Sequence, residues 1–169
     1  GLIVYRTGAP PRQQLTWFDR TGKVLGTLGA PNEAGTLGLR ISPDGRRVAV
    51  TRNVLSNDDV YLLDGIRSIR FTFDAGVDRL AIWSPDGSRV VLQSNRKGAR
   101  NLYVKPSSGA GGEELLFESP QDKTASDWSA DGRFILFNTA DPQTDQDMWV
   151  LPLAVYLATF ILCFGSPRA

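Results

Sequence analysis

A four-residue turn signal occurs three times in the chain and sets a repeat that constrains the fold. Ser42–Gly45 and Ser84–Gly87 read SPDG, Ser129–Gly132 reads SADG, and the spacings are 42 and 45 residues. Ser, Pro and Gly are favoured at the first, second and fourth positions of a type I turn, and Gly adopts positive φ easily. Each copy therefore predicts a tight turn between antiparallel strands. The residues expected to form these turns are Ser42, Pro43, Asp44, Gly45, Ser84, Pro85, Asp86, Gly87, Ser129, Asp131 and Gly132.

The sequence around each turn predicts four strands per repeat. A short apolar strand precedes the turn, and two β-rich runs separated by a polar loop follow it, as in RVVLQ from Arg89 and NLYVKP from Asn101. A fourth strand fits SIRFTF from Ser68 and EELLF from Glu113. Four strands in about 40–45 residues is the period of a β-propeller blade. We therefore predict an all-β fold, a partial β-propeller of about four blades, each with four antiparallel strands.

The repeat divides the chain into a propeller segment and a tail. Residues 1–153 are expected to form the partial propeller, with blades at approximately 1–30, 31–75, 76–120 and 121–153. Residues 154–169 depart from the repeat, because residues 151–164 are apolar apart from Thr159 and contain Pro152 near their start. This run is shorter than the roughly 20 residues that span a bilayer, so we expect no membrane insertion by this segment. It could be an apolar outer strand, a truncated membrane segment or sequence foreign to the domain, and we favour the last.

The repeats resemble those of a known family. ISPDGRRVAV, WSPDGSRVVLQSNRKGARNLYV and WSADGRFILF are similar to the WD-like propeller repeats of the TolB family and of prolyl-oligopeptidase-type peptidases. QLTWFDRTGKVLGTLG is most similar to the C-terminal sensor-like propellers of some bacterial membrane-bound Ser/Thr kinases. The resemblance covers residues 1–153 and implies an extracytoplasmic or periplasmic interaction module. The chain begins with Gly1, and we expect it to be part of a longer protein.

Composition excludes several classes of chemistry. The formal net charge is +1, which argues against a nucleic-acid-binding protein. The chain has no His, so no His-dependent triad, general base or metal ligand can come from it. Its single cysteine, Cys163, cannot form an intrachain disulfide and leaves the redox compartment open.

The motifs that could carry catalysis or bind a ligand favour structural roles. The chain has no G-x-S-x-G elbow, no phosphate-binding loop and no kinase signature, and GAGGEE at 109–114 fits a flexible loop between strands. The acidic runs at 56–59 and 141–147 lack the EF-hand pattern and are interpreted as turns. The repeated Asp44, Asp86 and Asp131 belong to separate turns, which argues against a carboxylate pair. We predict no enzymatic activity in this chain, no cofactor and no metal site.

The remaining candidates lie in loops between the second and third strands of each blade. These loops are expected at residues 7–13, 52–58, 94–100 and 138–146, on the propeller face opposite the SPDG turns. Loops on a rigid scaffold are common binding sites, although a merely solvated rim is an equally good interpretation. The possible binding rim comprises Arg52, Asn95, Arg96, Lys97, Arg100, Asp141 and Asp145.

The function predicted from these observations is binding or sensing without catalysis, with a protein or peptide partner. The alternative is the propeller of a serine peptidase, where it would gate a catalytic domain outside this chain, and a third possibility is a purely structural fragment. Because an arc of four blades would expose apolar faces and a free strand edge, we expect the isolated chain to self-associate.

Overall fold

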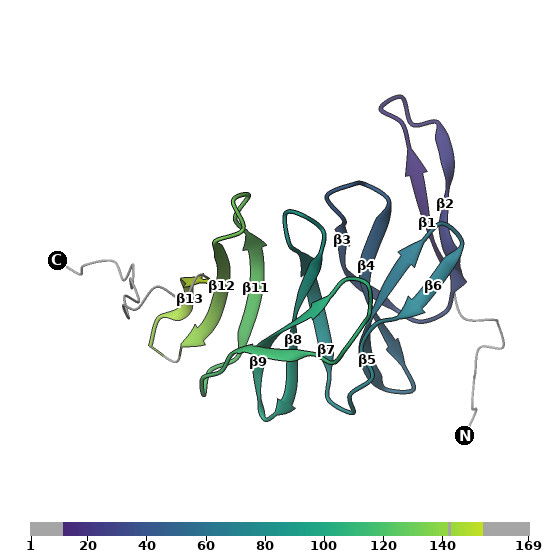
Figure 1. The fold of residues 1–169 in the computed structure, drawn as a ribbon. Coiled ribbons are helices and arrows are strands. Elements are labelled where there is room, and N and C mark those ends of the chain that lie inside the picture. The colour runs from purple at the N-terminus through teal and green to yellow at the C-terminus, as the bar shows by residue number, and fades with distance from the viewer. Residues whose placement is uncertain (1–11, 142, 154–169) are drawn as a thin grey trace, which may run out of the picture.

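The computed structural model describes residues 12–141 and 143–153 as a series of antiparallel β-sheets placed side by side (Figure 1). The first sheet contains β1 (Gln13–Phe18) and β2 (Val24–Asn32). The second contains β3 (Thr36–Ile41), β4 (Arg47–Val54), β5 (Asn57–Asp64) and β6 (Arg67–Arg70). The third contains β7 (Asp78–Trp83), β8 (Arg89–Lys97), β9 (Ala99–Pro106) and β10 (Glu114–Phe117), and the fourth contains β11 (Lys123–Trp128), β12 (Phe134–Asp141) and β13 (Asp145–Pro152).

Strands that follow one another in the sequence are hydrogen-bonded neighbours in every sheet. The orders are β1-β2, β3-β4-β5-β6, β7-β8-β9-β10 and β11-β12-β13, and all pairings are antiparallel. This arrangement confirms the predicted all-β fold and the partial propeller. In the described residues, no helix has the length and apolarity to cross a lipid bilayer. Residues 1–11 of the predicted first blade and the tail at residues 154–169 lie outside the described residues.

The hydrophobic core lies between the sheets, because successive side chains of a strand point to opposite faces. On β8, Val90 and Leu92 pack against the second sheet, in a cluster with Ala49 and Val60. Val91, which lies between them on β8, points the other way and joins the cluster shared with the fourth sheet. All three β8 side chains are fully buried. A smaller cluster joins the first and second sheets, and it includes Leu28, Val48, Val50 and Leu63.

Two arginine–tryptophan contacts also join neighbouring sheets. The Arg47 guanidinium of β4 lies 4.7 Å from the ring centroid of Trp83 on β7, and Arg89 of β8 lies 5.2 Å from that of Trp128 on β11. Both tryptophans are buried, so their rings contribute to packing between the sheets. A cation over the face of an indole ring adds a specific attraction to the burial of the ring.

The predicted polar loops between second and third strands are wrong in length. β4 continues to Val54 and β5 begins at Asn57, so the connection is Leu55–Ser56, with φ angles of 53° and 66°. Positive φ at both residues is typical of the tightest hairpin turns. Likewise, β8 and β9 are separated by Gly98 alone. Several polar residues assigned to these loops, such as Arg52, Asn95 and Arg96, are strand residues.

Candidate functional site

The three repeated turns share one hydrogen-bond network. The hydroxyl of the turn serine donates to the turn aspartate, at 2.5 Å for Ser42–Asp44, 2.6 Å for Ser84–Asp86 and 2.7 Å for Ser129–Asp131. The same serine oxygen accepts a backbone N–H five residues later at 2.9 Å in each copy. The glycine that ends each turn has a φ of 69° to 74°, in the left-handed region that favours glycine.

These bonds keep the turn carboxylates ionised. Donation from the serine hydroxyl, helped by backbone N–H groups, lowers the pKa of Asp86 and of Asp131 to about 2. The same hydroxyl donation lowers the pKa of Asp44. A carboxyl that accepts several hydrogen bonds and has a low pKa is poorly suited to general-acid catalysis at neutral pH. The turn aspartates therefore organise the hairpins.

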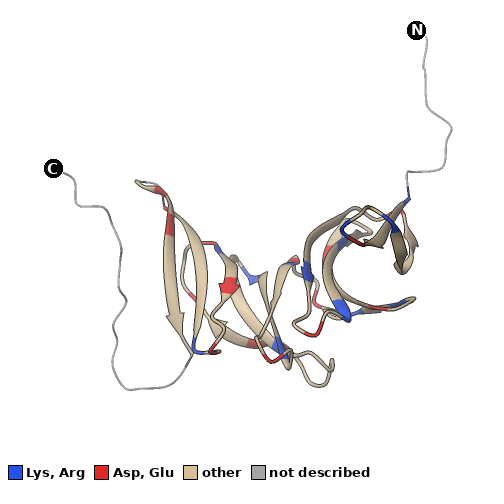
Figure 2. Cartoon of the chain, turned by 90° about the horizontal axis from the view of Figure 1, so that it is seen from above, with Lys and Arg blue, Asp and Glu red and all other residues tan. Residues whose placement is uncertain are grey.

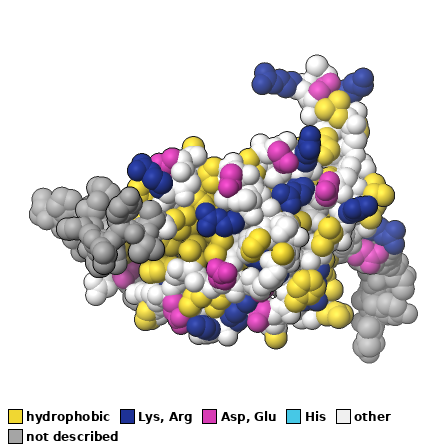
Figure 3. All heavy atoms as spheres, viewed as in Figure 1, with side chains coloured by type: hydrophobic (Ala, Val, Ile, Leu, Met, Phe, Trp, Pro, Cys, Tyr) yellow, Lys and Arg dark blue, Asp and Glu magenta, His cyan; other side chains and the backbone are white. Residues whose placement is uncertain are grey.

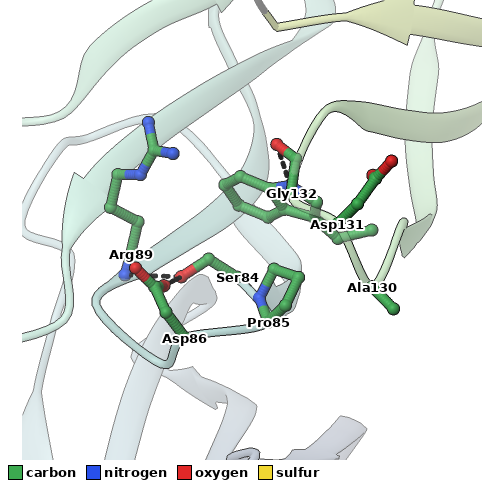
Figure 4. Close-up of a pocket in the computed structure, with 8 residues that line it drawn as sticks. Ser84, Pro85, Asp86, Arg89, Ala130, Asp131 and Gly132 are labelled. Atoms are coloured by element: carbon green, nitrogen blue, oxygen red, sulfur yellow. Dashed lines mark hydrogen bonds between the residues drawn. The ribbon is translucent and has the colours of Figure 1, made fainter.

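A cleft of about 340 Å³ separates the second and third of these turns (Figure 4). Pro85 and Arg89 line one side and Ala130 and Gly132 line the other. Figure 4 shows that the carboxylates of Asp86 and Asp131 lie on opposite sides and do not point toward one another. The cleft therefore lacks the converging carboxylates that glycoside hydrolysis requires.

The structure places two residues of the predicted rim inside the protein. Arg52 lies on β4 with 5% of its surface exposed, donates from Nη1 to Ser68 Oγ at 2.6 Å, and lies over the Tyr61 ring. Its burial lowers the pKa of the guanidinium. Arg96 lies on β8 and donates from Nη2 to both carboxylate oxygens of the fully buried Asp78, at 3.0 and 3.1 Å.

Arg96 has further partners that fix its position. It donates from Nη1 to Glu113 at 3.2 Å and from Nε to Ser94 at 2.9 Å, and it lies 4.5 Å from the ring centroid of Tyr103. Although burial opposes the charged form, the contacts with Asp78 and Glu113 raise the pKa of Arg96 overall. Arg52 and Arg96 therefore link segments of their own sheets.

The other rim residues lie near the surface at the ends of the hairpins. Asn95 accepts from the Val77 backbone N–H at 2.7 Å, and Asp141 accepts from the N–H of Gln143 at 2.7 Å, so both shape turns. Asp145 begins β13 and is exposed. Lys97 pairs with Glu118 at 3.3 Å, and both side chains are about half exposed. The Lys97–Glu118 pair is weak, because exposed ion pairs contribute little to stability.

Arg100 contributes to a cleft of about 260 Å³ at the hairpin end of the inner strands. The lining residues come from three sheets: Leu37 and Thr51 from the second, Arg79, Leu80, Gln93 and Arg100 from the third, and Thr124 from the fourth. The Arg79 and Arg100 side chains are 36% and 42% exposed. Arg100 pairs with the exposed Asp122 at 3.0 Å, and Arg79 pairs with the buried Asp58. The structure thus brings together the predicted Arg100 and Arg79, which the sequence analysis missed.

Two buried lysines were also missed. Lys123 at the start of β11 is fully buried, and its Nζ donates to Asn101 Oδ1 at 2.8 Å, Ser119 O at 2.9 Å and Gln121 O at 2.6 Å. Burial lowers the pKa of Lys123. Lys105 on β9 donates to the Phe71 carbonyl and to Glu113. Both ammonium groups are buried and bonded to these acceptors, which favours a structural role for each.

No group of three or more Cys, Asp or Glu side chains in the described ranges could hold a metal ion. In Figure 2, basic and acidic residues are interspersed along the strands and do not form a single stripe. The described residues are therefore of mixed charge, and the cleft at Arg79 and Arg100 is one place where basic side chains from one sheet lie close together.

Comparison with known proteins agrees with this architecture. Residues 9–152 match the family described as the TolB beta propeller domain. A putative TolB from Agrobacterium tumefaciens superposes with a TM-score of 0.63 at 19% identity, over 83% of this chain and 57% of that chain. TolB from Acinetobacter baumannii superposes with a TM-score of 0.67 at 23% identity, over 85% and 36% of the respective chains. At these identities the solved structures show a shared fold.

A curated relative, Tricorn protease homolog 1 of Streptomyces coelicolor, is 32% identical over 131 residues. The matched region is 75% of this chain and 12% of the relative, so the chain spans about an eighth of that protein's length.

Proposed function

The chain belongs to the TolB beta propeller domain family, and from this premise we propose that it is a non-catalytic binding module for a protein or peptide partner. The carboxylates of the three repeated turns, Asp44, Asp86 and Asp131, are bonded within their own hairpins and are not arranged for catalysis. Fold alone does not determine function, so the proposal depends on a particular surface.

The observation that carries the proposal is the cleft at the hairpin end of the inner strands. It presents the half-exposed guanidinium groups of Arg79 and Arg100 beside the polar side chains of Gln93 and Thr124. Because Arg100 is held only by an exposed pair with Asp122, a partner carboxylate could replace that pair at little cost. Guanidinium groups bind carboxylates through two parallel hydrogen bonds. We propose a peptide that presents acidic side chains or a terminal carboxylate.

Binding of labelled octapeptides tests this proposal. We expect a peptide of Glu and Gly to bind the wild type in low salt and its Gln analogue to bind much more weakly. The affinity of Arg100→Glu for the acidic peptide should be lower than that of the wild type by about tenfold or more. Arg20→Glu is the matched control, because Arg20 is exposed on the β1–β2 turn, away from the cleft. Equal affinities of the wild type and Arg100→Glu, measured by fluorescence anisotropy, would refute the proposed site.

A peptidase context is the second candidate, and the similarity to Tricorn protease homolog 1 favours it. In that case the propeller would control access to a catalytic domain elsewhere in a longer protein. Sequencing the coding region on both sides distinguishes the contexts. A G-x-S-x-G elbow followed by Asp and His supports a serine peptidase. Kinase signatures followed by an apolar span of about 20 residues support the sensor propeller of a membrane-bound kinase.

Location and association also belong to the proposal. By resemblance to its family we propose an extracytoplasmic or periplasmic location, which fractionation of cells expressing the complete gene would test.

We further propose that residues 1–153 form one propeller unit and that the isolated chain self-associates. Exposed apolar residues on the first strand of the second sheet, Leu37, Leu39 and Ile41, support self-association, which sedimentation at several concentrations measures.

A further inference from the structure

The outer edge of β13 differs from the corresponding edge of the two complete sheets. In those sheets β5 pairs with β6 and β9 pairs with β10. In the described residues, β13 pairs with β12 on one side and has no strand on the other. An unpaired edge presents backbone N–H and C=O groups to any extended chain of suitable sequence.

An apolar groove of about 220 Å³ lies beside this edge. Phe117 from β10, Phe137 from β12, and Trp149 and Leu151 from β13 line it, and the two phenyl centroids are 5.4 Å apart. On the opposite face of β13, Met148 and Val150 are 60% and 46% exposed. Hydrophobic side chains gather on the visible surface in the region of β11–β13 (Figure 3). The edge therefore offers apolar contacts to a strand laid along it.

The repeat identifies a polar anchor on the same edge. Asp59, Asn101 and Asp147 occupy the same position in DVYLLD, NLYVKP and DMWVLP, the third strands of their sheets. Asp59 accepts hydrogen bonds from Arg70 at 2.6 Å and Thr72 at 3.2 Å, and Arg70 belongs to the fourth strand β6. Asn101 accepts from the Ser119 N–H, just after the fourth strand β10.

Asp147 lacks the corresponding partner in the described part of the chain. Asp59 and Asn101 are each 1% exposed, whereas Asp147 is half-buried, and no described residue forms an ion pair with it. Arg70 follows Asp59 by 11 residues, and the same offset from Asp147 reaches Ala158. The first basic residue after Asp147 is Arg168. The sequence that follows β13 therefore has no cation at the expected offset.

We propose that the edge of β13 that is unpaired in the described residues binds an extended peptide strand from a partner protein. Alternate apolar side chains of this strand fill the groove at Phe117 and Trp149, and an Arg or Lys side chain pairs with Asp147. Strand addition of this kind takes affinity from backbone hydrogen bonds and specificity from the side-chain pockets. The site is separate from the cleft at Arg100 and does not depend on the function proposed above.

The nonapeptide GIRSIRFTF, which is residues 65–73 of this chain, serves as the probe because it contains the strand that binds Asp59. We expect the labelled peptide to bind the full chain. The Asp147→Lys variant should have an affinity for this peptide that is about tenfold or more lower. The charge-reversed peptide GIRSIEFTF should bind Asp147→Lys better than the wild type. Asp64→Lys, an exposed carboxylate at the end of β5, is the matched control. Arg100→Glu should leave binding of GIRSIRFTF unchanged, which separates this site from the cleft.

Three outcomes would overturn the proposal. The first is equal binding by the wild type and Asp147→Lys. The second is binding that occurs only when the chain is shortened to end at Leu153, because residues 154–169 would then be the occupant. The third is no binding, together with a dimer that Asp147→Lys dissociates, because a second copy would then cover the edge. Circular dichroism of each variant verifies that the sheets remain folded.

Discussion

Replacement of Lys123 by Met tests whether a buried ammonium group stabilises the junction between the third and fourth sheets. The substitution keeps an unbranched side chain and removes the donor to Asn101, Ser119 and Gln121. Ser119 is half-buried and Gln121 is exposed, so water can donate to their carbonyl groups in place of the lysine. The Asn101 oxygen is buried and loses a charge-assisted bond of roughly 1.5–3 kcal/mol. Since removal of the buried charge offsets part of this loss, we expect about 2 kcal/mol of destabilisation.

Urea unfolding followed by tryptophan fluorescence measures this difference, and about 2 kcal/mol corresponds to a fall in Tm of roughly 4–8 °C. Lys97→Met is the matched control, because Lys97 is 51% exposed and pairs with an exposed Glu118, so its loss should cost under about 1 kcal/mol. Burial lowers the pKa of Lys123 below 10.5, so the folded state releases this proton first. Wild-type stability should therefore rise relative to Lys123→Met as the pH approaches 10.5. An equally or more stable Lys123→Met would refute the reasoning.

Three further predictions concern the repeated turns. Ala130→Pro restores the residue found in the other two copies and should stabilise the chain by about 0.5 kcal/mol, measured by urea unfolding; a loss of stability would contradict it. Gly87→Ala places a side chain at a φ of 69° and should cost about 1 kcal/mol in the same assay, whereas an unchanged midpoint would show that the turn relaxes. The pKa of Asp86 is about 2 when folded against a model-peptide value of 3.8, so its contribution is present above pH 3.8 and lost as pH falls toward 2. Between pH 4 and pH 2, the Tm of Asp86→Asn should therefore fall less than the Tm of the wild type. Parallel curves of Tm against pH for the two proteins would contradict this.

Much of the fold could be predicted from the sequence because its turns are encoded locally. Ser, Asp and Gly at fixed positions form bonds within six residues of one another, and these bonds do not depend on the rest of the protein. The β-rich run after each turn, as in Val90, Val91 and Leu92, predicted a strand, and the structure packs the two faces of this strand against two neighbouring sheets.

The partners of the charged rim residues could not be predicted, because they are distant in the sequence. Arg96 resembles a loop residue when Ser94–Arg100 is considered alone, yet Asp78 and Glu113 lie 18 and 17 residues away. Lys123 has no sequence signal at all, because two of its three acceptors are backbone carbonyls. Arg79 gains its place in the cleft only when three sheets come together.

The placement of the core between sheets affects how such a chain can lengthen during evolution. The second sheet shares one buried cluster with the first sheet and another with the third, and the third shares its other face with the fourth. A duplicated repeat brings both halves of a new interface with it, because each sheet carries a surface for the sheet before it and one for the sheet after it. Gene duplication can therefore insert another unit without redesign of its neighbours, and stability should increase stepwise with the number of interfaces.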